Sequence, residues 1–364
     1  MTTVSFPGLG INEFTINPIA IPIGDGGIRW YALFIVTGMI FALLYCSLRA
    51  KKEGIILDTI MDFAIFTIPV GIIGARLYYV FFDWLAAVTN GEPSPYKSFY
   101  DVIAIWEGGL AIYGGIIFGA LTILVVAKIK KFSWTSLFKL ADTAAPGVMI
   151  AQAIGRWGNF CNGEAYGSAT TLPWRMCSDN FAFSLRAKGL IDSDTYYAML
   201  EGTTGVHPTF LYESLWNILG FILINIFYKK KRFDGQITLM YITWYGFGRM
   251  LIELLRTDSL TTGGALRISS LVGLLCFVVG GSLLLALFIK NKGKCAYTPV
   301  SANSAPTNEP AETVSKNTTD KKEVFGDKTL TNDGISPQNE NGSNIENTNI
   351  NQENSEENDN GKLN

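Results

Sequence analysis

Histidine and paired cysteines are almost absent from this sequence. Its 364 residues include one histidine, His207, and five cysteines with no CxxC pair. A metal site built from histidines is therefore excluded, and a Ser-His-Asp triad would have to use His207. We expect no metal and no cofactor. His207 precedes a proline at the start of an apolar stretch, so we predict that it makes a structural hydrogen bond.

Charge is also scarce, and it is unevenly placed. Charged residues make up 16% of the chain, against about 25% in an average soluble domain. Residues 301–364 contain 12 acidic residues and 5 lysines, whereas residues 1–300 contain 19 acidic and 24 basic residues. The net charge of -2 therefore conceals a basic first part and an acidic tail. We expect no nucleic-acid partner.

The sequence contains several long apolar runs. Seven are long enough to cross a hydrocarbon core of about 30 Å. They are Trp30–Leu48, Thr59–Phe82, Val102–Val126, Phe138–Ile154, Thr209–Tyr228, Ile237–Leu255 and Ile268–Ile289. We predict an all-α integral membrane protein with about seven transmembrane helices. The fourth run is the weakest, because it is short and contains Asp142 and Pro146. The N-terminus lacks a basic region and a small-residue cleavage site, so we expect no removable signal peptide.

Basic residues mark alternate connections between these runs. They are RAKK (49–52), KIKK (128–131), KKKR (229–232) and KNKGK (290–294). The positive-inside rule makes these segments cytoplasmic, with the N-terminus outside and the C-terminus inside. Residues 83–101 and 156–208 are then extracytoplasmic, and the second segment is predicted to form a small head. Cys161 and Cys177 lie in that segment and could pair, although we favour unpaired thiols.

The end of the chain has a different composition. Fourteen of the last 64 residues are Asn, and Phe325 is the single aromatic residue among them. Such a segment cannot bury enough apolar surface to offset chain entropy. We therefore predict a membrane domain at 1–295 and a disordered cytoplasmic tail at 296–364.

Polar residues inside the apolar runs fall mainly on one side of the membrane. The predicted topology places these in the outer half: Arg29, Tyr31, Arg76, Glu107, Tyr113, Arg156, Asn159, Tyr212, Glu213, Arg249, Glu253 and Arg256. A charge near the bilayer centre costs about 2.5–3.5 kcal/mol on insertion, so such residues are usually functional or paired. Because guanidinium groups match phosphate oxygens, we interpret the group as a net-positive cavity for an anionic lipid headgroup. Arg–Glu pairs that only join helices are the alternative.

Two acids and several glycines have plainer interpretations. Asp62 and Asp142 lie near cytoplasmic ends, where contact with solvent explains their charge. Gly-rich pieces at 71–76 and 108–120 allow helices to approach closely.

The stretch GRWGNFCNGEAYG, residues 155–167, resembles the signature of the prolipoprotein diacylglyceryl transferase family of bacterial membrane enzymes. Other pieces resemble the family in the same order: RWYAL (29–33), GARLYYV (74–80), WEGGLAIYGG (106–115), HPTFLYES (207–214) and YGFGRMLIELLRTD (245–258). The resemblance extends from residue 29 to about residue 290. Trp157 and Cys161 depart from it, as do Tyr113 and Arg29, where members often have His.

The resemblance implies a seven-helix enzyme of the bacterial inner (cytoplasmic) membrane. Its reaction moves the diacylglyceryl group of phosphatidylglycerol onto the thiol of the lipobox cysteine in a prolipoprotein signal peptide. The products are a thioether-linked lipid and glycerol phosphate. Because the nucleophile belongs to the substrate, this chain needs no catalytic Cys or Ser. The implied partners are phosphatidylglycerol, prolipoprotein signal peptides and membrane lipids.

The resemblance also implies site residues. The expected catalytic residues are Arg156, Arg249, Asn159, Glu164 and Tyr113, with the two arginines holding the phosphate. The expected substrate-binding residues are Tyr31, Arg76, Gly114, Gly115, Gly167, Glu213, Glu253 and Arg256. A phenol is a poor base at neutral pH, so either Tyr113 positions lipid or another group, such as Glu164, takes the thiol proton.

Two other functions compete with this interpretation. A lipid transporter or flippase with an outward-facing arginine-lined cavity predicts polar residues at both faces and internal repeats, and the sequence shows neither. An inactive scaffold of the same fold is the other alternative, because Tyr113 stands where family members often have His.

Overall fold

Seven long helices form at the seven apolar runs. The computed structural model describes residues 2–24, 26–257 and 267–297. Within these ranges the helices of 18 residues or more are α1 (Trp30–Glu53), α2 (Leu57–Thr89), α4 (Ile112–Ile129), α5 (Trp134–Asn162), α8 (Thr209–Tyr228), α9 (Gln236–Glu253) and α10 (Ile268–Lys290). The helix positions predicted from hydropathy are therefore confirmed. The bounds differ most for α5, which extends beyond its predicted range at both ends, and for α4, which begins at Ile112 instead of Val102.

Five of the described helices are long and apolar enough to cross a membrane: α1, α2, α4, α8 and α10. Helices α5 and α9 contain more polar residues and do not meet the same criterion. Helix α5 packs against α1, α8 and α9, and α9 also packs against α10. A helix surrounded by other helices does not need a continuous apolar surface, because its polar groups can face the protein. The chain is a mostly helical membrane protein.

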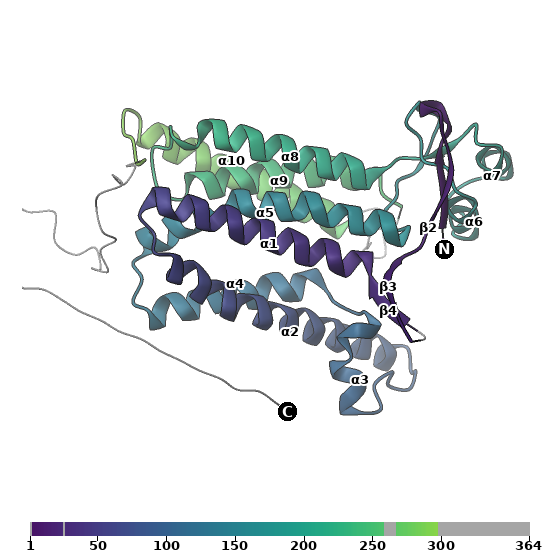
Figure 1. Cartoon of the computed structure of the whole chain (residues 1–364), viewed down its shortest axis with the longest axis horizontal. Helices are drawn as coiled ribbons and strands as arrows, with labels where there is room; N and C mark the ends of the chain where they lie inside the picture. Colours follow the sequence, from purple (N-terminus) through teal and green to yellow (C-terminus); the bar gives the residue numbers. More distant parts are fainter. Residues whose placement is uncertain (1, 25, 258–266, 298–364) are drawn as a thin grey trace, which may run out of the picture. The chain divides into compact units, whose positions relative to one another are not determined.

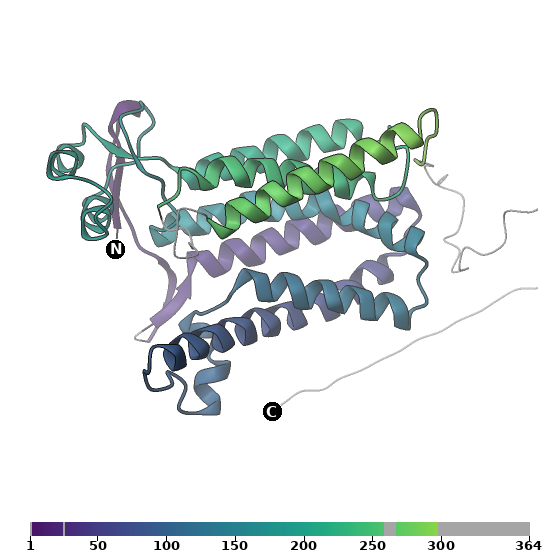
Figure 2. The same ribbon diagram turned by 180° about the vertical axis from the view of Figure 1, so that it is seen from behind.

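The long helices pack in three main pairs, α1 with α5, α9 with α10, and α2 with α4. In Figure 1, α8, α9 and α10 lie above α1 and α5, with α2 and α4 below, and Figure 2 shows the same order from behind. Glycines make the close approaches possible. A Cβ at Gly246 of α9 would lie 2.6 Å from the carbonyl oxygen of Gly273 in α10. The glycine pattern in the sequence is thus a packing pattern.

Glycines also divide the third apolar run. The chain forms α3 (Phe99–Ile103) and a 3₁₀ turn, η2 (Ile105–Glu107), before α4 begins at Ile112. Gly108 and Gly109 separate these elements with φ angles of 100° and 71°. Because only glycine readily takes such angles, a helix over all of 102–126 is not formed, and that predicted start was wrong.

Short strands at the N-terminus correct the all-α prediction. One hairpin pairs β1 (Thr2–Phe6) with β2 (Ile11–Ile16), after a 3₁₀ turn η1 (Pro7–Leu9), and a second pairs β3 (Ile19–Ile23) with β4 (Gly26–Arg29). The second hairpin leads directly into α1. These strands have four to six residues, too few to appear as apolar runs of membrane length.

The segment between α5 and α8 forms a small lobe at one end of the bundle (Figure 1). It contains β5 (Ala169–Thr170), α6 (Asp179–Ala187), α7 (Ser193–Leu200) and β6 (Gly205–Val206). Its core includes Met176, Phe181 and Leu185, together with Val4 from β1. The backbone of Ser5 pairs with that of Cys177, so the N-terminal hairpin is part of the lobe.

The cysteines are unpaired, which confirms the preferred interpretation. All five lie among the described residues and all are free thiols. Cys177 is buried in the lobe, where its Sγ lies 3.5 Å from the carbonyl oxygen of Thr204. Burial raises the pKa of this thiol, so it stays protonated at neutral pH.

Asp142 is not exposed to solvent, contrary to expectation. It is 0% exposed, and its carboxylate accepts hydrogen bonds from the backbone N–H groups of Gly235 and Thr238, both at 2.9 Å. Nζ of Lys231 lies 3.6 Å from the same carboxylate. The prediction failed because Lys231 is 89 residues away in the chain. Asp62, in contrast, is partly exposed and pairs with Lys130. The predicted tail lies almost wholly outside the described residues and stays a prediction.

Candidate active site

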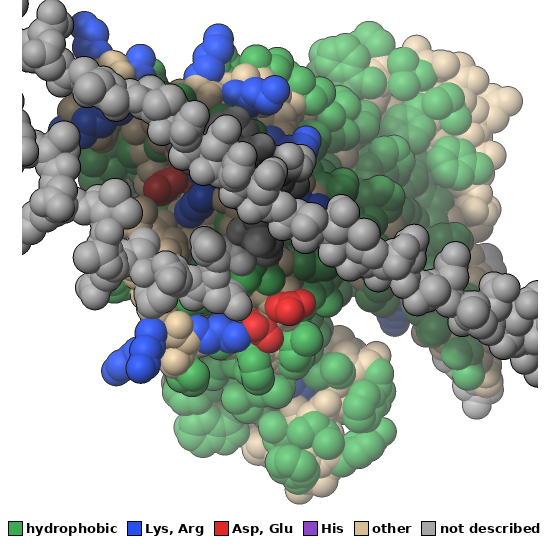
Figure 3. Space-filling view, turned by 60° about the vertical axis from the view of Figure 1, so that its left-hand side comes forward, with side chains coloured by type: hydrophobic (Ala, Val, Ile, Leu, Met, Phe, Trp, Pro, Cys, Tyr) green, Lys and Arg blue, Asp and Glu red, His purple; other side chains and the backbone are tan. Residues whose placement is uncertain are grey.

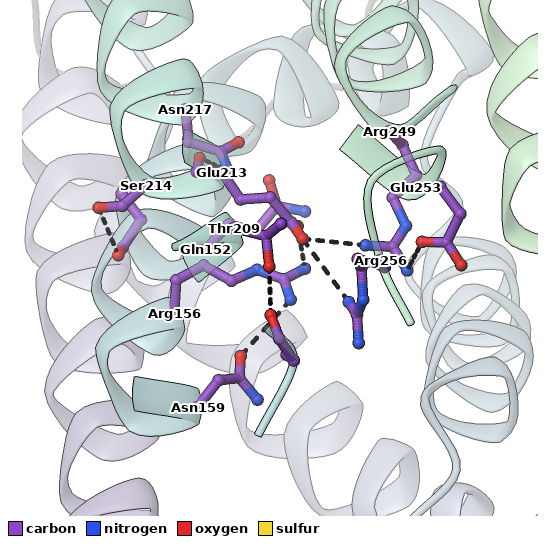
Figure 4. Close-up of polar contacts among 12 residues, drawn as sticks. Gln152, Arg156, Asn159, Thr209, Glu213, Ser214, Asn217, Arg249, Glu253 and Arg256 are labelled. Atoms are coloured by element: carbon purple, nitrogen blue, oxygen red, sulfur yellow. Dashed lines mark hydrogen bonds and ion pairs between the residues drawn. The ribbon is translucent and has the colours of Figure 1, made fainter. Parts of the chain in front are cut away.

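Three arginine side chains converge on one buried carboxylate (Figure 4). Glu213, in the second turn of α8, is 5% exposed. Its Oε2 lies 2.6 Å from Nη2 of Arg156, near the end of α5. Its Oε1 lies 3.1 Å from Nη1 of Arg249 in α9 and 3.6 Å from Nη1 of Arg256, just after α9. One acidic residue therefore joins the ends of three helices.

Arg249 connects this carboxylate to a second one. Its Nη2 lies 2.7 Å from Oε2 of Glu253, one turn further along α9. Glu253 is 1% exposed, and its backbone carbonyl accepts a hydrogen bond from Arg267 at the start of α10. A planar guanidinium group can contact two carboxylates at once, which a lysine ammonium group cannot do with the same geometry.

The arginine cluster, defined as Arg156, Arg249 and Arg256, brings three guanidinium groups to two buried carboxylates. All three face Glu213, and Arg249 also faces Glu253. The carboxylate side chains are 1–6% exposed and the arginine side chains 13–19%. The acids are thus inside the protein and the arginines reach the surface of the site. Such an arrangement favours an anionic ligand.

The end of α5 places a row of polar groups beside Arg156. Oδ1 of Asn159 lies 3.5 Å from Nη1 of Arg156, and Nδ2 of Asn159 donates to Oε1 of Glu164 at 2.9 Å. Asn162 donates to the same oxygen at 3.2 Å. Gly163, with φ of 66°, ends the helix and turns the chain so that Glu164 folds back onto it. Three residues expected to be catalytic therefore form one connected row.

Tyr31 lies beside this row. It is in the first turn of α1, where its ring packs on Gly158 of α5. A Cβ at Gly158 would lie 2.8 Å from the Tyr31 ring, so a larger residue would displace it. The phenol is close enough to Glu164 and Arg156 to interact with both charges.

Gly167 acts through the backbone. Its N–H donates to the carbonyl of His207 at 2.9 Å, and the next N–H, of Ser168, donates to the carbonyl of Leu255 at 2.7 Å. A Cβ at Gly167 would lie 2.9 Å from that Leu255 oxygen. The absence of a side chain at Gly167 thus allows its segment to approach the segment after α9. The backbones of Gly167 and Arg256 form an antiparallel bridge, which fixes the position of Arg256. A cavity of about 290 Å³ adjoins Arg256 at this junction.

His207 makes the structural hydrogen bond predicted for it. Its Nδ1 lies 3.1 Å from the hydroxyl of Tyr212, which accepts a hydrogen bond from Nε1 of Trp174 at 2.7 Å. Burial lowers the pKa of His207, so the ring is neutral at pH 7 and adds no charge to the arginine cluster.

Tyr245 belongs to this site and was not singled out from the sequence. It lies on α9 one turn before Arg249, and its phenol is within electrostatic range of Arg249, Arg156 and Glu213. Tyr113, in the first turn of α4, is also within electrostatic range of the Tyr245 phenol, so α4 reaches this site as well. The four-residue spacing between Tyr245 and Arg249 is the signal that could have identified it.

Arg76, expected to bind substrate, makes different contacts. It is 7% exposed on α2, and its guanidinium group donates to four backbone carbonyls. The acceptors are Asp101 at 2.7 Å, Val102 at 2.8 Å, Gly108 at 2.7 Å and Gly109 at 3.1 Å. These contacts fix the 99–109 segment against α2, which is a positioning role.

Arg76→Lys is expected to loosen the 99–109 segment, because one ammonium group cannot replace a fork that satisfies four carbonyls. The expected loss of stability is about 1.5–3 kcal/mol per broken charged hydrogen bond, and it stays local to this segment. Hydrogen exchange of the 99–111 amides would measure it. Unchanged exchange combined with lost transferase activity would instead support the substrate-binding role.

Gly114 and Gly115 face α2. A Cβ at Gly115 would lie 3.5 Å from the carbonyl oxygen of Gly71, and one at Gly114 would overlap Gly74 and Tyr78. The close contact between α2 and α4 therefore requires Gly114, whereas a Cβ at Gly115 would make only an ordinary contact. The substrate-binding role expected for both stays a prediction. The side chain of Glu107 lies outside what the structure describes. Within the described residues, no three His, Cys, Asp or Glu side chains are grouped as metal ligands would be.

Comparison with known proteins identifies the family of this chain. The family model described as prolipoprotein diacylglyceryl transferase matches residues 18–286. Two curated relatives, from Streptococcus pyogenes serotype M5 (strain Manfredo) and serotype M49 (strain NZ131), carry the name phosphatidylglycerol–prolipoprotein diacylglyceryl transferase. This chain is 44% identical to each over 267 residues, which cover 73% of this chain and 93% of the relative.

Proposed function

The chain belongs to the prolipoprotein diacylglyceryl transferase family, and from that premise we propose that its arginine cluster binds the phosphate of phosphatidylglycerol. The chain is a transferase that moves a diacylglyceryl group in lipoprotein maturation. The observation that supports the arginine cluster as its site is the convergence of Arg156, Arg249 and Arg256 on Glu213, with the arginine side chains 13–19% exposed at the surface of the site.

The reaction explains why converging guanidinium groups are useful. The thiolate sulfur of a lipobox cysteine attacks the glyceryl carbon that carries the phosphate. A C–S bond forms, the C–O bond breaks, and glycerol phosphate leaves with the electron pair. Negative charge therefore grows on the phosphate oxygens in the transition state. Preorganised donors aimed at such charge contribute about 10²–10³ in rate each, and more in a water-poor site.

Glu213 has a supporting role in this proposal. Its carboxylate holds guanidinium groups from Arg156 and Arg249 at 2.6 Å and 3.1 Å, which orients both before substrate arrives. Donors that are already oriented do not need to reorganise when the charge develops. The remaining N–H groups of the two arginines are then available to the phosphate.

The thiol proton has one structural candidate acceptor. Glu164 accepts hydrogen bonds from Asn159 and Asn162 at the edge of the arginine cluster. A free thiol is already a few per cent ionised at pH 7, and a positive site increases that fraction. We propose that Glu164 or solvent takes the proton and that Tyr113 positions lipid.

Tyr113→Phe is expected to keep transferase activity within about tenfold of wild type, because a general base typically contributes about 10²–10⁴ and a phenol does not serve as one here. Initial rates with saturating lipid would measure this. Glu164→Gln is the matched comparison, and it should lose more activity than Tyr113→Phe. A complete loss in Tyr113→Phe with the fold intact would show that the hydroxyl takes part in the chemistry.

The orientation in the membrane follows from the same proposal. We propose seven spans, with α5 and α9 crossing inside the bundle and the lobe of 164–208 as an extracytoplasmic head. The arginine cluster would then face the outer leaflet of a bacterial inner (cytoplasmic) membrane, where both a lipid and a signal peptide can reach it. The basic connections at the other end support this orientation. An inactive scaffold or a flippase is not favoured, since the relatives are named as transferases.

The test uses purified full-length protein, phosphatidylglycerol and a peptide with a lipobox cysteine. Release of glycerol phosphate and the mass of the peptide are followed together. Equal amounts of released glycerol phosphate and diacylglyceryl-modified peptide are expected. A peptide in which serine replaces the cysteine is the control. Glycerol phosphate released without modified peptide would mean that water, not the thiol, is the acceptor.

A further inference from the structure

An apolar groove lies at the end of the bundle opposite the arginine cluster. It is formed by the end of α8, the start of α9 and the last turns of α10, and it encloses about 600 Å³. This is within the range of about 300–1,000 Å³ for sites that enclose a small molecule. Its lining is Phe227, Lys230, Arg232, Gln236, Met240, Thr243, Gly281, Leu284, Leu285 and Phe288.

The groove opens on a surface that faces lipid. Helices α8 and α10 both have the length and composition of membrane spans. Phe227, Leu285 and Phe288 on the groove walls are 46%, 60% and 36% exposed. Large apolar side chains with this exposure are covered by hydrocarbon in a membrane protein, so an acyl chain has direct access to the groove.

The end of the groove is positively charged. Lys230 and Arg232 line it, and four more exposed basic residues lie at or just after the ends of α8 and α10: Lys229, Lys290, Lys292 and Lys294. Figure 3 shows basic side chains at this end of the bundle. None of the six makes an ion pair with a described residue. Arg232 is held in place, because its Nη1 donates to the carbonyl of Phe288 at 3.1 Å and its guanidinium carbon lies 3.5 Å from the centre of that ring. Gln236 fixes its backbone by accepting from the Arg232 N–H at 2.8 Å.

From these contacts we propose that the groove binds one anionic phospholipid, with an acyl chain against α10 and the headgroup phosphate on Lys230 and Arg232. The apolar lining matches an acyl chain, and the two cations at its polar end, which form no ion pair with a described residue, match a phosphate. Basic residues where a membrane helix meets the headgroup region are typical of sites for acidic lipids. The site is separate from the arginine cluster, so it does not depend on the proposed catalytic roles.

The test is photolabelling of the full-length protein in phosphatidylcholine nanodiscs. The probe is phosphatidic acid with a diazirine near the end of one acyl chain, and the labelled peptides are identified by mass spectrometry. Label is expected in the peptides that contain Met240 and Leu284. Unlabelled phosphatidic acid should compete much better than additional phosphatidylcholine. Label in peptides of the arginine cluster would report lipid bound at the proposed catalytic site, and it is quantified separately from label in the groove.

Two variants separate charge from groove shape. Lys230→Gln with Arg232→Gln should lower groove labelling about twenty-five-fold, because each basic residue near an anionic group contributes roughly fivefold. Lys292→Gln with Lys294→Gln removes the same charge at the same end and should leave labelling close to wild type. Gly281→Leu fills the groove without a change of charge and should also reduce labelling. A Cβ at Gly281 meets only Thr243, at 3.4 Å, so this variant should fold.

Three outcomes would overturn the proposal. Equal competition by phosphatidylcholine would show that the groove holds bulk lipid without recognition of charge. An equal loss of labelling in the two charge variants would show that the overall positive potential at this end attracts the probe, without a specific contact to Lys230 or Arg232. Absence of groove label together with cross-links between two copies at α10 would show that a second chain covers the groove. Diacylglyceryl transfer by each variant verifies that it is folded.

Discussion

Arg249→Met is expected to lower the rate of diacylglyceryl transfer by at least about a thousandfold, the loss typical of an arginine that stabilises phosphate charge. Arg249 contacts both carboxylates of the site, at 3.1 Å to Glu213 and 2.7 Å to Glu253. In the proposed role, its removal takes away a donor to the phosphate and one of the three arginine contacts to Glu213. Initial rates of glycerol phosphate release would measure the effect.

Two further variants test whether the effect is specific. Arg249→Lys keeps the charge and removes the fork, so it should fold and still lose most of the activity. Arg186→Met removes an arginine of α6 that donates to the carbonyl of Ile191 and the hydroxyl of Ser193, and it should retain activity. The phosphate role would be abandoned if Arg249→Met kept more than about a tenth of the wild-type rate, a loss far smaller than one oriented donor provides.

Lys231→Met is expected to reduce the free energy of unfolding by about 3–5 kcal/mol, because it leaves buried carboxylates without a counter-ion. Its ammonium group is 0% exposed and lies 3.4 Å from Glu53, 3.6 Å from Asp142 and 3.3 Å from Asp234. These contacts join the end of α1, the middle of α5 and the turn between α8 and α9. Denaturant unfolding in detergent would measure the loss.

The neighbouring lysine provides the control for this prediction. Lys229→Met changes the same charge on an exposed side chain and should be nearly neutral. Adding Glu53→Gln to Lys231→Met should recover part of the stability, since it removes one of the unpaired acids. A stable Lys231→Met protein that had lost transferase activity would contradict the structural role, since this cluster lies at the end of the bundle away from the arginines.

The positions of the long helices could be predicted because each reflects a local property of the chain. About 20 apolar residues in sequence favour a membrane helix whatever surrounds them. The boundaries were less predictable. Helix α5 reaches Asn162 because Gly163 ends it with a left-handed angle, whereas the apolar run ends at Ile154. The third run is interrupted at Gly108 because its glycines adopt positive φ angles that composition alone does not reveal.

Membership of the site was partly predictable, and the contacts within it were not. The row from Arg156 to Glu164 is within nine residues, so one motif contains it. The i, i+4 pair of Arg249 and Glu253 is equally local. Arg76 was expected to bind substrate, yet its hydrogen bonds go to backbone carbonyls 25 to 33 residues away. A charged residue in an apolar run indicates that a partner exists, but it does not identify that partner.

By itself, the sequence determined that this protein is a mostly helical membrane transferase and which motif carries its arginines, because hydropathy and short motifs are local. Tertiary structure alone decided that Glu213 holds three arginines, that Lys231 neutralises Asp142, and that Arg76 supports a loop. The physical reason is that a buried charge is stabilised by whichever opposite charge the packing of helices brings within about 4 Å, and residues far apart in the chain meet only through that packing.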